Sequence, residues 1–163
     1  MCDYSLMAIP NRLAVSGEEL VIHRFEPGAV GGLASPCDLR KRQEYRRVPS
    51  YGFWQRLKEF FDPPSAPAIP AVCIPPGARL LVRDIPAKLR RECGIQKDLE
   101  EAVFTQITAA ENTCRDAVRF PNGIEVLLQR FAEGQRVRVL SLASAEEWET
   151  GPIEQRGASI RVA

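Results

Sequence analysis

Apolar and polar residues alternate with a period of two over much of the chain, the pattern of half-buried strands. The pattern predicts strands at 4–9, 12–15, 20–25, 71–74, 78–82 and 101–108. The second and third of these flank Ser16-Gly17-Glu18-Glu19, which predicts a hairpin, and Pro75-Pro76-Gly77 is a further turn signal. We therefore expect a mainly β fold, an antiparallel sheet or small open barrel with two short helices. An α+β fold is the alternative.

The clearest alternation lies in residues 116–142, where the turn residues agree with it. Segments 116–120, 124–131 and 136–142 are separated by Pro121-Asn122-Gly123 and by a second turn at 132–135. Together they predict a three-strand meander in which Gly123 adopts a positive φ. A short last strand is predicted at 158–162. Residues 27–32, rich in glycine, predict a flexible loop instead of a strand.

Residues 37–70 interrupt the strand pattern with a basic run, a helical stripe and a proline-rich stretch. The basic run holds Arg40, Lys41, Arg42, Arg46 and Arg47. The stripe, at helical spacing, holds Phe53, Leu57, Phe60 and Phe61, with Trp54 beside it. A second short helix is predicted at 86–94, between a first-turn proline and a terminal glycine. We expect one β-rich domain, 1–163, with a basic and aromatic helical insertion and a proline tether at 37–70.

Composition narrows the function classes. The 163 residues carry a formal net charge of +1, so no global charge drives the chain onto nucleic acid or anionic membranes. No segment approaches the roughly 18 apolar residues of a membrane-spanning helix, and no secretory signal opens the chain. The five cysteines are scattered and there is one histidine, which predicts reduced thiols, no metal site and no cofactor. The predicted location is the cytoplasm.

Cys2 is the most suggestive candidate for chemistry. Removal of Met1 would place its thiol beside a free α-amine, a nucleophile next to a base. The apolar pattern of Tyr4, Leu6 and Ile9 favours the other interpretation, a buried structural thiol in a strand. His23 lies in the middle of a predicted strand, which favours a partly buried structural residue over a catalytic base.

Two resemblances bear on function. Cys2, with Asn122-Gly123 as an oxyanion-stabilising pair, resembles the N-terminal-nucleophile glutamine amidotransferases, although Asn-Gly is also explained as a turn. Cys2-Asp3-Tyr4-Ser5-Leu6, Pro76-Gly77-Ala78-Arg79-Leu80 and the stretch from Arg115 to Val137 resemble an uncharacterised family of small bacterial proteins that open in the same way. That resemblance implies no catalytic role, and it implies that 37–70 is specific to this lineage.

The prediction that follows is a non-enzymatic accessory or protein-interaction module, with a β scaffold and a docking insertion. Its partner would bind through residues 38–61, by the basic run and the aromatic stripe. The alternative for the stripe is that it covers the protein's own sheet. An N-terminal-cysteine hydrolase or amidotransferase-like enzyme is the second function. A nucleic-acid-binding module, using the same basic residues with Tyr45 and Tyr51, is the third, and a membrane surface is a further possible partner.

Overall fold

The computed structural model describes residues 9–26, 30–47, 67–107, 114–142 and 161–162, the side chains of 46, 47, 161 and 162 excepted. The fold is mainly β, as predicted. The strands are β1 (Asn11–Leu13), β2 (Glu19–Phe25), β3 (Val30–Ala34), β4 (Ala71–Cys73), β5 (Arg79–Val82), β6 (Glu100–Gln106), β7 (Asp116–Arg119), β8 (Glu125–Leu127), β9 (Arg136–Ser141) and β10 (Arg161–Val162). The helices are α1 (Pro36–Arg47), α3 (Ala87–Cys93) and the 3-10 turn η2 (Leu128–Arg130).

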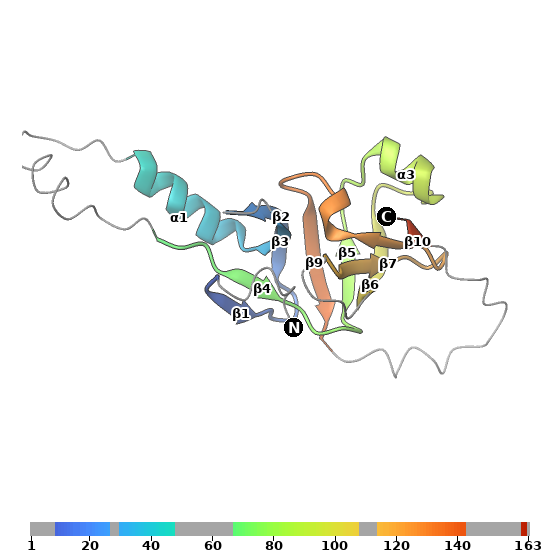
Figure 1. Cartoon of the computed structure of the whole chain (residues 1–163), viewed down its shortest axis with the longest axis horizontal. Coiled ribbons are helices and arrows are strands. Elements are labelled where there is room, and N and C mark those ends of the chain that lie inside the picture. The colour runs from blue at the N-terminus through green and yellow to red at the C-terminus, as the bar shows by residue number, and fades with distance from the viewer. Residues whose placement is uncertain (1–8, 27–29, 48–66, 108–113, 143–160, 163) are drawn as a thin grey trace, which may run out of the picture.

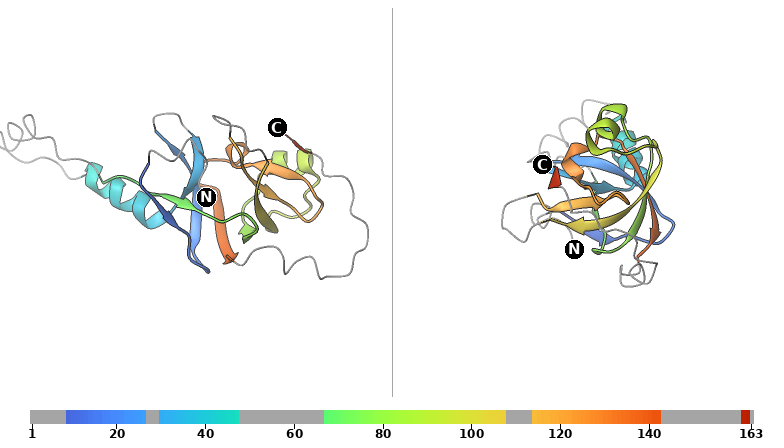
Figure 2. Two further views of the ribbon diagram at one scale, coloured as in Figure 1. Left: turned by 60° about the horizontal axis from the view of Figure 1, so that its bottom comes forward. Right: turned by 90° about the vertical axis from the view of Figure 1, so that its right-hand side faces the viewer.

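Eight strands form one sheet in the order β10-β8-β7-β6-β5-β9-β2-β3. Its pairs are antiparallel except for β10, which lies parallel to β8. The described strands curve together without closing into a barrel (Figure 1). A separate two-stranded sheet pairs β1 with β4 in parallel. Figure 2 shows this small sheet and α1 at one end of the molecule and α3 at the other.

Period-two alternation in the central strands gives the large sheet one buried face. On β9, Val137 and Val139 are buried between the exposed Arg136 and Arg138. The buried face belongs to one large core cluster, to which α3 adds the buried Leu89 and Cys93. The alternation in the sequence therefore placed the core correctly on these strands.

The outer face of the sheet carries charged side chains that pair across neighbouring strands. Arg79 donates to Glu101 at 2.7 Å, and Arg136 to Asp84 at 2.8 Å. The Arg136 hydrogen bond holds the pKa of Asp84 below its ordinary value. Because these pairs are largely exposed, each contributes little to stability and the face stays solvated.

A second, smaller core lies between β2, β3 and β4. It is formed by the buried Phe25, Ala34, Ala71 and Cys73. Partly buried side chains of Ile9, Val30, Leu39 and Ile69 pack against it. This cluster attaches the small sheet and the start of α1 to the large sheet.

Two sequence predictions of strand pairing and one of a loop are wrong. The chain turns at Gly17 as predicted, but β1 and β2 do not pair: β1 pairs with β4, and β2 pairs with β3 and β9. β9 does not join the predicted meander: η2 redirects the chain after β8, and β9 runs between β5 and β2. Gly31 and Gly32 belong to strand β3, where a side chain on Gly31 would meet the backbone of Gln129 at 3.4 Å. Close backbone packing explains that glycine better than a flexible loop does.

The turn between β7 and β8 is as predicted, with Gly123 at φ 82°. A Cβ built there meets nothing within 4 Å, so backbone strain alone opposes a larger residue. We expect Gly123→Val to lower the free energy of unfolding by roughly 1–3 kcal/mol, because a β-branched residue rarely adopts a positive φ. Chemical denaturation measures it. Gly123→Asn is the control, since asparagine tolerates this conformation, and equal midpoints for both variants would contradict the prediction.

The cysteines differ from the sequence prediction at one position. Cys37, Cys93 and Cys114 form no disulfide, but Cys73 is disulfide-bonded. Burial raises the pKa of Cys93, so this thiol is unreactive at neutral pH. The predicted reduced state is therefore wrong at Cys73.

Candidate functional site

Helix α1 covers the basic run, whereas the sequence predicted the helix of this insertion at the aromatic stripe that follows it. Ser35 caps it: its Oγ accepts a hydrogen bond from the backbone N–H of Cys37 at 3.3 Å, and its carbonyl accepts one from Leu39 at 3.2 Å. Pro36 occupies the first helical position and Asp38 the first turn. The Ser-Pro pair ahead of Asp38 was the signal in the sequence that would have predicted this helix.

Among the described residues, helix α1 contacts the rest of the protein through Leu39 and through Arg42, which donates to the carbonyl of Pro67. Leu39 packs against the second core, whereas Gln43, Glu44 and Tyr45 are exposed. Figures 1 and 2 show the helix leading away from the sheets.

The charge of α1 is strongly positive. Its twelve residues contain five basic and two acidic ones, a formal net charge of +3, whereas the whole chain has +1. Arg40 and Lys41 are exposed, and Lys41 pairs with Asp38 at 3.5 Å. Arg42 is half-buried and donates to the carbonyl of Pro67 at 3.1 Å. Arg46 and Arg47 lie in the last turn, where only the backbone is described.

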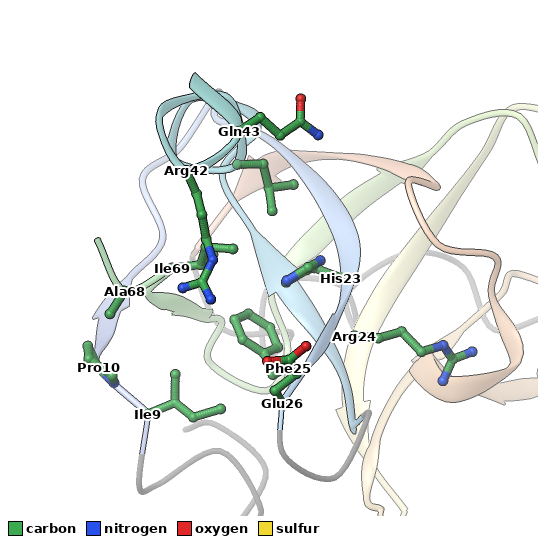
Figure 3. Close-up of a pocket in the computed structure, with 11 residues that line it drawn as sticks. Ile9, Pro10, His23, Arg24, Phe25, Glu26, Arg42, Gln43, Ala68 and Ile69 are labelled. Atoms are coloured by element: carbon green, nitrogen blue, oxygen red, sulfur yellow. The ribbon is translucent and has the colours of Figure 1, made fainter. Parts of the chain in front are cut away.

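A pocket of about 430 Å³ lies at the base of α1 (Figure 3). It is bounded by the end of β2, by one side of α1 and by the segments that lead into β1 and β4. Its lining residues are Ile9, Pro10, His23, Arg24, Phe25, Glu26, Leu39, Arg42, Gln43, Ala68 and Ile69. The described residues of this lining supply charged, amide and apolar groups but no hydroxyl or thiol, so they offer the chemistry of binding.

His23 is held in a fixed orientation at the edge of this pocket. Its Nδ1 lies 2.7 Å from Oε1 of Glu133, and its ring meets Phe25 edge to face with centroids 4.9 Å apart. The other Glu133 oxygen accepts the backbone N–H of Arg24 at 2.8 Å. The turn that carries Glu133 is itself fixed to β2, since Gly134 donates to the carbonyl of Ile22 at 2.8 Å. A carboxylate thus orients the imidazole from behind the pocket.

The predicted candidate residues are only partly brought together. Of the partner-binding set, the basic residues lie on α1, while Phe53, Trp54, Leu57, Phe60 and Phe61 lie outside the described residues. Cys2 also lies outside them. The side-chain nitrogen of Asn122 donates to the carbonyl of Cys93 at 2.8 Å, and its oxygen accepts the N–H of Ile124 at 3.1 Å. This amide ties the β7–β8 turn to the end of α3.

Sequence reasoning missed the pocket and the role of Glu133. Glu133 is 110 residues from His23, in a turn that the sequence explained without it. The pocket combines four segments that are separated in the sequence. Neither feature has a local signature, so neither was predictable from spacing.

Comparison of the chain with protein-family models, curated proteins and solved structures gave no match. The two resemblances noted from the sequence therefore stay predictions. In the described ranges, no cluster of three or more His, Cys, Asp or Glu side chains is arranged to hold a metal ion. None of the described helices combines the length and apolar character needed to cross a membrane.

Proposed function

We propose that this protein is a non-enzymatic accessory module whose β sheets present helix α1 to a partner protein with an acidic surface. The observation that carries the proposal is the projecting basic helix: a net charge of +3 on a segment whose Arg40 and Lys41 side chains are exposed. Opposite charge on a partner would accelerate encounter and fix orientation.

The local physics of α1 supports a docking role. A helix of twelve residues is marginal by itself in water, and its polar residues lie on every side. The Ser35 cap and the Leu39 contact stabilise its first turns, but neither explains why Arg40 and Lys41 are exposed together. An acidic partner gives these charges a role that packing within the domain does not.

The test compares two double charge reversals that change net charge equally. Arg40→Glu with Lys41→Glu alters α1. Lys97→Glu with Arg119→Glu alters two exposed basic residues outside α1, one between α3 and β6 and one on β7. We expect wild type to bind a Glu- and Asp-rich peptide in a salt-dependent manner. The α1 variant should bind about tenfold more weakly, while the control stays close to wild type.

The alternatives are outcomes of the same titration. Tighter binding of a single-stranded oligonucleotide than of the acidic peptide would favour the nucleic-acid-binding module, in which Tyr45 stacks on bases. Binding to anionic vesicles would favour the membrane surface. Equal losses in the two variants would show a nonspecific charge effect and would refute docking through α1.

A further inference from the structure

The pocket at the base of α1 combines an apolar floor with a cation on its helix side. Figure 3 shows the side chain of Arg42 extending from α1 into the pocket, toward Phe25. Phe25 is buried, and Ile9, Leu39 and Ile69 are partly buried against the same second core. The volume of about 430 Å³ lies within the range of small-ligand pockets, roughly 300–1,000 Å³. The pocket can therefore hold a small ligand with an apolar body.

Arg42 is held in place and keeps hydrogen-bond donors for a ligand. Its side chain is half-buried, and its Nη1 donates to the carbonyl of Pro67 at 3.1 Å. In the described part of the chain, none of the ion pairs involves Arg42. The remaining N–H groups of its planar fork suit a carboxylate. Because the fork is already oriented, less conformational entropy is lost when an anion binds.

The other charged groups of the lining determine which way round a ligand lies. Glu26 is exposed and lies toward the end of the pocket that is farther from α1 (Figure 3). His23 is bound through Nδ1 to Glu133. The guanidinium of Arg24 points away from the pocket and donates to the carbonyl of Gln129 at 3.0 Å. One end of the pocket therefore attracts a carboxylate, and the other end repels it.

We propose that this pocket binds an apolar monocarboxylate, such as octanoate, with its carboxylate on Arg42 and its hydrocarbon chain over Phe25, Ile9 and Ile69. Charge-assisted hydrogen bonds fix the carboxylate, and the chain removes apolar surface of the pocket from water. An amine would have to pair with Glu26, whose exposure lets water screen the attraction. A dicarboxylate would place its second charge among apolar groups or toward Glu26. This ligand is independent of the acidic partner proposed for the exposed side of α1.

Calorimetric titration with octanoate and with ligands of the same chain length tests the proposal. Octan-1-ol has no charge, octylamine has the opposite charge, and octanedioate has a second carboxylate. We expect octanoate to bind and each of the others to bind about tenfold more weakly or worse. Hexanoate should also bind about tenfold more weakly, because two fewer methylene groups are buried. No binding of octanoate at millimolar concentration, or equal binding of octylamine or octan-1-ol, overturns the proposal.

Matched variants locate the carboxylate and the far end of the chain. Arg42→Gln should weaken octanoate binding by about tenfold or more, whereas Arg119→Gln, the same charge change at an exposed position on β7, should leave it unchanged. Equal losses in these two variants overturn the assignment. Glu26→Gln should bring the affinity for octanedioate closer to that for octanoate, because a repulsion is removed. If Arg42→Gln lowers the unfolding midpoint, Glu26→Gln, at an exposed position, decides the test: no gain for octanedioate relative to octanoate overturns the assignment.

Discussion

Replacement of Cys73 by alanine is expected to lower the free energy of unfolding by roughly 2–5 kcal/mol, the cost of losing a native disulfide from a small domain. Cys73 is disulfide-bonded, ends β4 and is buried in the second core. The bond restricts the unfolded chain, and its loss also disturbs a cluster that joins two sheets. Reduction of wild type should have a similar effect.

The disulfide at Cys73 can be mapped directly. Of the five cysteines, Cys37, Cys93 and Cys114 form no disulfide. We expect a non-reduced digest to yield Cys73 within a disulfide-linked peptide, and the mass of that peptide identifies the partner cysteine.

Denaturation with and without a reductant gives the control. Reductant should lower the midpoint of wild type and of Cys37→Ala but leave Cys73→Ala unchanged, since that variant has no bond to lose. Alkylation without reductant at all five cysteines, or a midpoint insensitive to reductant, would contradict the prediction. Disulfides are rare in the cytosol, so the bond at Cys73 weighs against the cytoplasmic location predicted from the sequence.

The sequence predicted strands well because alternation is a local property. β5, β6 and β9 lie where the pattern placed them, and α3 begins after Pro86 and ends at Gly94 as expected. Strand partners depend on contacts between distant segments, which alternation does not encode. β9 follows β8 in the sequence yet pairs with β5 and β2, because η2 turns the chain and buries Leu128.

For the candidate site, too, the local features were predicted and the contacts between distant segments were not. The charge of Arg40, Lys41 and Arg42 marked the basic segment, but its helical form depended on the Ser35 cap, a weak local signal. The pocket beside it depends on α1, β2 and the entry to β4 meeting at Phe25. Such a meeting is set by the tertiary fold, so residue types alone predicted the charges and not the cavity.

Phe25 belongs both to the second core and to the lining of the pocket. We expect Phe25→Ala to lower the free energy of unfolding by roughly 3–5 kcal/mol. The side chain is 4% exposed, lies in the second core with Ala71 and Cys73, and meets the ring of His23. Removal of the Phe25 ring leaves a cavity. Strand pairing holds the backbone of the surrounding residues in place, so they cannot move in to fill it.

Phe25→Leu is the matched variant, because it keeps an apolar side chain in the same place and should cost less than half as much as Phe25→Ala. Denaturation followed by circular dichroism measures both. Hydrogen exchange at the start of α1 should also accelerate in Phe25→Ala, since Leu39 packs on the same cluster, while exchange in α3 should change little. A cost below about 1 kcal/mol for Phe25→Ala would show that the second core is not tightly packed.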